Sequence, residues 1–325
     1  MKNKFCISFL LIVLIALITT PAKAQILLSV NQKIENLKAF TRLYWYVKYF
    51  HPSDEADKTD WDKFAVYGTS VVVNCENRDE LIRVLNNLFL PVAPSIKIYP
   101  TENDVNFDIN CITPENKDSC TLTYWQHQGV GYGMVLNDYS PYASIRVNRS
   151  SYYNDTRIKL EPELFEASPE FGEYINKDIG SGISAIIPLV LCSDKRHTYP
   201  IAKENLHDSI FSLINRNDDN DLYVRLGGIV VTWNVFQHFY PYFDVVDVNW
   251  SNELENAFLK CLDSKEDYLV ILEELMAPLR DGHISVHKKG FQYGSLPVEV
   301  EIVEDKLIIT AVYDNTLLIK AGDII

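Results

Sequence analysis

The C-terminal third of the chain carries three stretches with a helical hydrophobic pattern. The first runs from Leu226 to Pro241 and is apolar and rich in aromatic residues. We expect it to form a helix that stops before Pro241, because proline cannot continue a helix. A second helix is predicted after Trp250, and a third from about Glu266 to Met276. In the third, apolar residues recur at the three- and four-residue spacing of one helix face, namely Leu269, Leu272, Leu275 and Met276.

The residues after the third helix change character. Pro278 marks the end of the helix, and Asp281, Gly282 and His283 follow as a polar turn. The next residues, Ile284–Val286, are rich in β-branched side chains, which favour a strand. The pattern therefore predicts a helical module that delivers a histidine onto the start of a strand.

The segment Ile34–Tyr99 repeats this pattern in a diverged form. Its aromatic residues and prolines precede their counterparts by one constant offset, which slips slightly before the third helix. The matched pairs are Tyr44 with Trp233, Phe50 with Phe239, Pro52 with Pro241, Trp61 with Trp250, Leu85 with Leu272, Leu88 with Leu275, and Pro91 with Pro278. The shared breakers and aromatics predict one structural unit used twice, and the alternative is two unrelated helix pairs. Pro94–Ile96 replaces the polar turn in the first copy, where we expect no matching chemistry.

Between the two copies, residues 101–221 are patterned as strands separated by Gly, Asn, Asp and Pro. The strands expected are Thr121–His127, Ala143–Val147 and Ile183–Leu191. A β-sandwich or jelly-roll insert is the predicted form. Its aromatic residues are candidates for stacking on sugars or peptides, although core and rim positions are the alternative: Tyr124, Trp125, Tyr132, Tyr139, Tyr142, Tyr152 and Tyr153. The glycines of Gly129–Gly133 predict a β-turn rather than a phosphate loop, because neither a lysine nor a helix start follows.

Composition limits the classes of partner. The chain has 325 residues, of which 47% are hydrophobic, and this favours packed cores over disorder. The formal net charge is −14. Such a charge repels nucleic acid and anionic membrane surfaces, so we expect neither as a partner.

The first residues resemble a secretory leader. Lys2 and Lys4 precede the apolar run Phe5–Ile18, and Ala22–Ala24 supplies small residues for cleavage before Gln25. The apolar run is shorter than the roughly 20 residues that span a bilayer, and no later segment is long enough. We therefore predict a signal peptide over 1–24, export to the periplasm or the extracellular space, and no membrane span in the mature chain.

Five cysteines follow the leader, an odd number for an oxidising compartment. Cys111 and Cys120 bracket a polar loop and are the only pair close in sequence, so they are the candidate disulfide pair, while the pairing as a whole stays open. The cysteine spacings suggest no zinc site. His283 and His287 have a metal-binding spacing only on a helix, whereas a strand is expected there. We predict neither a metal nor another cofactor.

The last residues alternate as strands and end in a turn. Leu296–Val312 has strand alternation, and Lys320–Ile325 closes with Gly322-Asp323-Ile324. Together with the preceding module, this arrangement resembles the carboxyl-terminal-processing (tail-specific) serine peptidases, in particular the tricorn-core-like branch. In that family an aromatic helix, a proline, a tryptophan and a helix ending in Leu-x-Asp-x-His precede a PDZ domain. The matching residues here are Trp233, Phe239, Pro241, Trp250, Tyr268, Leu279, Asp281 and His283.

The resemblance implies a role for His283. The tricorn-like branch uses a histidine at this position as the general base for a serine in a later catalytic domain. Gly282 departs from the pattern, because the tricorn core has a polar residue there with a supporting role. A Ser-Lys mechanism, as in other family members, therefore stays open. A histidine that caps the turn is the structural alternative.

These observations predict an α+β multidomain protein. We expect a helical module at 25–100, a β-sandwich-like domain at 101–221, a second helical module ending in Asp-Gly-His at 222–290, and an incomplete PDZ domain at 291–325. The resemblance implies the N-terminal portion of an exported serine endopeptidase that acts on peptide or protein substrates. The fragment is expected to be inactive alone, since the serine domain would lie after Ile325. The alternative is a secreted protein that binds peptide or glycan without catalysis.

Overall fold

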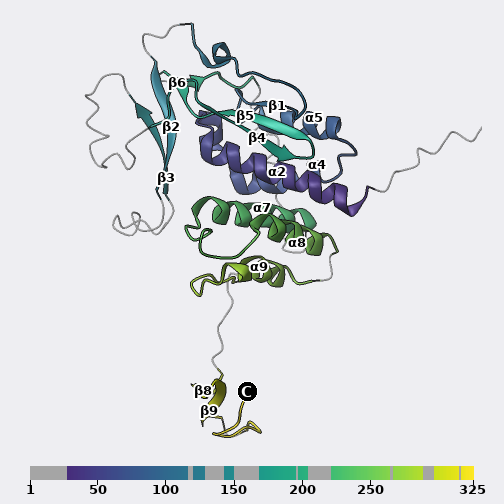
Figure 1. Cartoon of the computed structure of the whole chain (residues 1–325), viewed down its shortest axis with the longest axis vertical. Coiled ribbons are helices and arrows are strands. Elements are labelled where there is room, and N and C mark those ends of the chain that lie inside the picture. Colours follow the sequence, from purple (N-terminus) through teal and green to yellow (C-terminus); the bar gives the residue numbers. More distant parts are fainter. Residues whose placement is uncertain are drawn as a thin grey trace, which may run out of the picture. The chain divides into compact units, whose positions relative to one another are not determined.

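A computed structural model describes residues 28–115, 120–128, 143–149, 168–194, 197–203, 221–263, 266–287, 296–314 and 316–325. The predicted leader lies outside these residues. The chain divides into two compact units, Met1–Gly282 and His283–Ile325. Helices and antiparallel sheets both contribute to it, which confirms the α+β class (Figure 1). The finer layout, with a β-sandwich-like domain and a PDZ start, stays a prediction.

The first helical module contains four helices: α2 (Val30–Phe50), α3 (Asp54–Lys58), α4 (Trp61–Val72) and α5 (Arg78–Phe89). Polar residues cap the starts of these helices, as their sequence positions favour. Ser29 accepts a hydrogen bond from the backbone of Gln32, and Asn77 accepts one from Glu80. The short α3 was not predicted. It begins directly after Pro52, where Ser53 is its N-cap.

The second helical module contains α7 (Leu222–Phe239), α8 (Trp250–Asp263), α9 (Tyr268–Met276) and the 3-10 turn η4 (Ala277–Leu279). The predicted helices and both proline stops are confirmed. α7 ends two residues before Pro241, and α9 ends two residues before Pro278, which lies within η4.

The helix ends of the two modules coincide in the repeat. Phe50 and Phe239 end α2 and α7, whereas Trp61 and Trp250 begin α4 and α8. A hydrogen bond between the matched helices is also repeated. Tyr44 of α2 donates its hydroxyl to the carbonyl of Trp61 in α4, and Trp233 of α7 donates its indole N–H to the carbonyl of Trp250 in α8. These helix ends agree with the predicted repeat, although α3 has no helical counterpart after Pro241, and one structural unit used twice stays a prediction.

The two copies pack reciprocally. α4 packs on α7, and the matching pair, α8 and α2, is also in contact, while α2 and α7 lie side by side (Figure 1). The aromatic rings at the ends of α2 and α7 also make reciprocal contacts. Tyr49 stacks on its own counterpart, His238, with ring centroids 4.1 Å apart, and Tyr49–Phe239 and Phe50–His238 are 5.6 and 5.5 Å apart. Reciprocal contacts of this kind indicate a local twofold axis between the copies.

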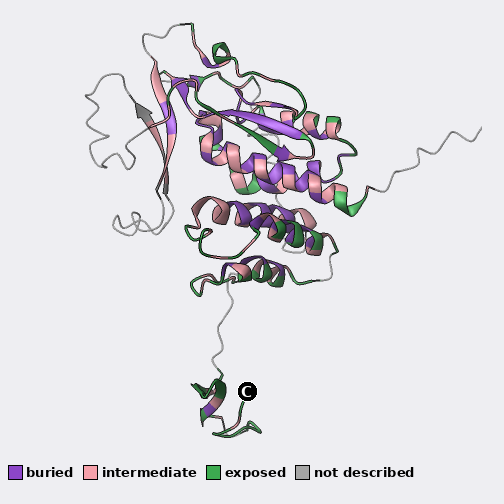
Figure 2. Ribbon diagram, viewed as in Figure 1, coloured by how far each residue is buried: buried purple, intermediate pink, exposed green. Residues whose placement is uncertain are grey.

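Two antiparallel sheets pack with these helices in the same unit. One has the order β1 (Lys97–Pro100), β5 (Ile183–Pro188) and β4 (Tyr174–Gly180). All six residues of β5 are buried, and α2 packs against β4 and β5, so this sheet belongs to the core (Figure 2). A turn at Gly180–Gly182 joins β4 to β5, with all three residues at positive φ.

The second sheet has the order β3 (Ala143–Arg149), β2 (Thr121–Gln128), β6 (Leu191–Ser193) and β7 (Thr198–Tyr199). It is tied to the chain just after α2 and to the start of α3. The Trp125 indole donates to the carbonyl of His51, and Arg146 pairs with Asp54 at 2.7 Å. The predicted strands at 121–127 and 143–147 are confirmed. Ile183–Leu191 is divided between β5 and β6 rather than forming one strand.

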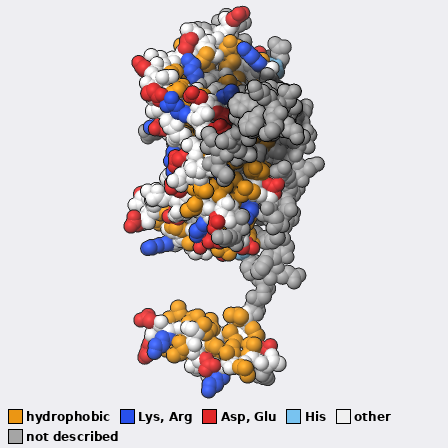
Figure 3. Space-filling model, turned by 90° about the vertical axis from the view of Figure 1, so that its right-hand side faces the viewer, with side chains coloured by type: hydrophobic (Ala, Val, Ile, Leu, Met, Phe, Trp, Pro, Cys, Tyr) orange, Lys and Arg blue, Asp and Glu red, His pale blue; other side chains and the backbone are white. Residues whose placement is uncertain are grey.

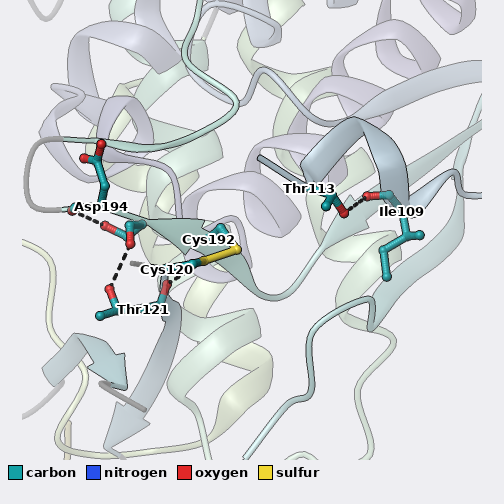
Figure 4. Close-up of a disulfide and its surroundings, with 7 residues drawn as sticks. Ile109, Thr113, Cys120, Thr121, Cys192 and Asp194 are labelled. Carbon is teal, nitrogen blue, oxygen red and sulfur yellow. Dashed lines mark hydrogen bonds between the residues drawn. A yellow bond between two sulfur atoms is a disulfide. The ribbon is translucent and has the colours of Figure 1, made fainter. Parts of the chain in front are cut away.

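The disulfide prediction is wrong. Cys120 is bonded to Cys192, with Cα atoms 5.5 Å apart, and Cys111 is a free thiol (Figure 4). The reason is the sheet register, because β2 pairs with β6 and brings Cys120 beside Cys192. Cys111 instead lies in a 3-10 helix, Ile109–Ile112. Proximity along the sequence was therefore a poor guide to proximity in space.

The second unit contains one hairpin, β8 (Val298–Val303) paired antiparallel with β9 (Lys306–Val312). Glu304 and Asp305 form its two-residue turn, both with positive φ, the geometry of the tight turns that join twisted strands. The chain end runs along β9, where Gly322 donates its backbone N–H to Ile309. The strand alternation predicted for Leu296–Val312 is thus confirmed.

Candidate functional site

The turn before His283 is fixed at its helical end. Asp267 caps α9, and Leu275, Met276 and Leu279 are buried. Arg280 adopts a left-handed conformation with φ 51° and donates its N–H to Ala277. Residues in the left-handed conformation commonly end helices. They reverse the chain direction and allow the following N–H groups to donate hydrogen bonds to the last helical carbonyls. The chain therefore reverses at Arg280, within the first unit.

Tyr240, at the end of α7, contacts the same segment. Its hydroxyl donates to the carbonyl of Leu279 at 3.0 Å. Partial burial, and then the neighbouring charge of Asp281, raise the pKa of the Tyr240 hydroxyl. Because Tyr240 stays protonated at neutral pH, its hydroxyl remains a hydrogen-bond donor.

His283 lies in the predicted turn, and its side chain is exposed. The strand predicted at Ile284–Val286 is wrong: these residues have no strand structure. A strand needs a hydrogen-bonded neighbour, and the hairpin strands β8 and β9 pair with each other rather than with this segment. The β-branched side chains of Ile284–Val286 favour an extended backbone, but they do not specify a partner strand. His287 is also exposed.

Gly282 leaves room for a side chain. A Cβ built at this position meets nothing within 4 Å, and Gly282 is not among the residues with positive φ. The absence of a polar residue here, relative to the tricorn-like pattern, is therefore not imposed by packing. Either a Ser or an Ala fits this position sterically.

His51 was not singled out from the sequence, although it belongs to a buried polar cluster. It is fully buried at the end of α2, and its ring nitrogens lie 3.0 Å from Ser53 Oγ and 2.7 Å from Ser95 Oγ. Burial lowers the pKa of His51 to about 3. Ser95 is 4% exposed, so no substrate reaches this Ser–His contact. The contacts of His51 with Ser53 and Ser95 therefore join two segments of the first module.

A second cluster places His127 from β2 against His238 from α7, with ring centroids 4.3 Å apart. The Trp45 indole donates to Nδ1 of His238 at 3.2 Å. An indole is a donor only, so the neutral His238 carries its proton on Nε2. Nε2 is buried and has no hydrogen-bond partner among the described residues. This tautomer leaves no lone pair on Nε2 for a metal.

The environment keeps both of these histidines neutral. Burial lowers the pKa of His127 to about 4, against a smaller opposing effect of the Tyr49 backbone. Burial, followed by the charges of His127 and Lys48, lowers the pKa of His238 to about 3. General bases work best with a pKa near the operating pH, so these rings are poorly suited to that role. The signal in the sequence that could have identified His238 is its match to Tyr49 in the repeat.

The aromatic candidates of the β region divide into two groups. Tyr124 is buried, and Trp125 binds the carbonyl of His51, so both are structural. The remaining candidates lie outside the described residues, as does Gly129–Gly133: Tyr132, Tyr139, Tyr142, Tyr152 and Tyr153.

Within the described ranges, His, Cys, Asp and Glu side chains form no group of three or more suited to a metal ion. Across the same ranges, every helix is too short or too polar to span a membrane. No protein-family profile, curated protein or solved structure matches this chain.

Proposed function

We propose that this chain is the N-terminal portion of an exported serine endopeptidase, in which His283 is the general base. The serine would come from a separate catalytic domain, and the substrate is a peptide or protein. The observation that carries the proposal is the exposed imidazole of His283 on a turn whose helical end is fixed by buried Leu279 and left-handed Arg280. An exposed imidazole is accessible to a serine hydroxyl of another domain, which a general base must approach within hydrogen-bond distance.

The contrast with the buried histidines supports this choice. His51, His127 and His238 are enclosed and have lowered pKa values, whereas His283 leaves the helical core on a turn. A Ser-Lys mechanism is the second form of the same proposal. Gly282 supports that form, because it offers no polar side chain to assist His283.

The hairpin of the second unit supports a PDZ-type role in substrate binding. Among the described residues, β8 pairs with β9 and has no partner on its other edge, where a peptide can add as a strand. Hydrophobic side chains gather on the surface of this unit (Figure 3), among them Leu296 and Ile302, each 76% exposed. We propose that an extended peptide substrate binds this edge.

The proposed function includes export from the cytoplasm. The Lys2–Ala24 leader pattern favours it, and so does the disulfide between Cys120 and Cys192, because such bonds persist in oxidising compartments. We therefore propose that the protein is exported to the periplasm or the extracellular space.

A covalent serine probe tests the proposal. A fluorophosphonate forms a bond to an activated serine and releases fluoride, so it labels a serine peptidase but not a binding protein. We expect the complete protein to be labelled, and His283→Ala to lose labelling while His287→Ala retains it. Labelling that survives His283→Ala would support the Ser-Lys form. Absence of labelling in the folded wild-type protein would overturn the proposal in favour of peptide or glycan binding.

A further inference from the structure

Both helical modules close with the same contact. In each, a side chain just after the first helix donates a hydrogen bond to a backbone carbonyl just beyond the last α-helix, which is α5 in the first module and α9 in the second. Ser53 Oγ donates to the carbonyl of Val92 at 2.6 Å, and Tyr240 donates to the carbonyl of Leu279 at 3.0 Å. Val92 and Leu279 are matched in the repeat, and both are buried, at 2% and 1% exposure. A serine in the first copy and a tyrosine in the second thus bind matched backbone carbonyls.

The two contacts differ in what lies beside them. In the first copy, Ser53 belongs to the buried cluster with His51 and Ser95. In the second copy, the carbonyl that Tyr240 binds belongs to the residue before left-handed Arg280. Asp281 is close enough for its charge to affect the Tyr240 hydroxyl. The second contact therefore lies at the root of the turn that leads to His283.

We infer that Tyr240 is a positioning residue for the His283 turn. Its hydroxyl fixes the carbonyl from which the chain turns, while the left-handed Arg280 sets the direction of the turn. This inference rests on the proposed function of His283. A general base must lie within hydrogen-bond reach of the proton that it removes. A displacement of about 1 Å far from the reacting atoms can lower a rate by about 10²-fold.

Replacing the hydroxyl tests the inference in the complete protein. We expect Tyr240→Phe to lower kcat about 10- to 100-fold with KM unchanged, because the substrate site is intact and only the base is displaced. Tyr242→Phe is the matched control. Tyr242 is 54% exposed, its ring lies 5.6 Å from that of Tyr240, and its hydroxyl makes no hydrogen bond to a described residue. Equal effects of the two substitutions on kcat would overturn the inference.

A second measurement does not depend on activity. In this chain, hydrogen exchange of the Arg280 amide, which binds Ala277, reports the rigidity of the turn. We expect Tyr240→Phe to accelerate this exchange by about 10-fold. Ser53→Ala, its counterpart in the first copy, should lower the melting temperature without affecting Arg280.

The two measurements separate the possible failures. Unchanged exchange in Tyr240→Phe would show that the hydroxyl does not hold the turn, and the inference would fail whatever the activity. Faster exchange, together with full turnover in His283→Ala, would instead show that the proposed role of His283 is wrong while the anchor at Leu279 stands.

Discussion

At the scale of single residues, solvent access divides the described histidines into two classes. His51, His127 and His238 are enclosed by aromatic or polar neighbours, and burial penalises their charged forms. His197, His283 and His287 are exposed. Solvent access therefore separates the histidine rings that pack in the core from those that solvent reaches.

The buried histidines predict how stability depends on pH. Their folded-state pKa values of about 3 to 4 lie below the unfolded value of about 6.5. In that interval the unfolded chain binds more protons than the folded one, so the free energy of unfolding falls as pH decreases. The contribution is complete above about pH 6.5 and is lost progressively toward about pH 3.

Denaturant unfolding between pH 6.5 and 4 measures this slope. We expect His238→Phe to reduce the slope of unfolding free energy against pH, because one titrating ring is removed. His197→Gln removes an exposed ring and should leave the slope at the wild-type value. If His238→Phe retained the wild-type slope, protonation of carboxylates would account for the acid sensitivity instead.

At the scale of elements, the helices were predictable and the strands were less so. Pro241 and Pro278 remove helical hydrogen bonds, and the aromatic residues at Phe50, Trp61, Phe239 and Trp250 mark helix ends in both copies. These are local signals. The strand predicted at Ile284–Val286 failed because a strand depends on a partner that the local sequence does not specify. The short α3 was missed because it spans barely more than one turn.

The close approach of α4 and α7 yields a prediction at this scale. A Cβ on Gly227 would lie 2.8 Å from the backbone nitrogen of Val66, so the two helices must separate to accept it. The resulting strain outweighs the gain in helix propensity, and we expect Gly227→Ala to lower the free energy of unfolding by about 1–2 kcal/mol.

Gly282→Ala is the matched control for this substitution. A Cβ there meets nothing within 4 Å, so the change should stay within about 0.5 kcal/mol of wild type. Both variants are compared by denaturant unfolding. A neutral Gly227→Ala would show that the two modules do not pack as closely as the structure indicates.

At the scale of the whole molecule, one crosslink joins strands far apart in sequence. Cys120 and Cys192 are separated by 72 residues. Sequence reasoning favoured Cys111 because it compared spacing along the chain, whereas the pairing of β2 with β6 decides the partner. The local twofold axis between the modules likewise depends on contacts between residues that are far apart in sequence. The repeat predicted two similar units, but the stacking of Tyr49 on His238 is visible only after folding.

Peptide mapping under non-reducing conditions tests the crosslink. We expect one linked pair of peptides containing Cys120 and Cys192, with Cys111 modified by an alkylating reagent after unfolding. Because the bond closes a long loop, its removal by Cys120→Ala with Cys192→Ala should lower the free energy of unfolding by about 2–4 kcal/mol. A linked Cys111 peptide would contradict this topology.

Turnover and melting temperature, measured together on His283→Ala in the complete protein, test the central claim most directly. We expect turnover to fall about 10²–10⁴-fold, the usual contribution of a general base. The melting temperature should stay near wild type because His283 is exposed. His287→Ala should preserve both quantities. If His283→Ala lowered the melting temperature while activity per folded molecule remained at the wild-type level, His283 would be a structural residue and our account of this site would be wrong.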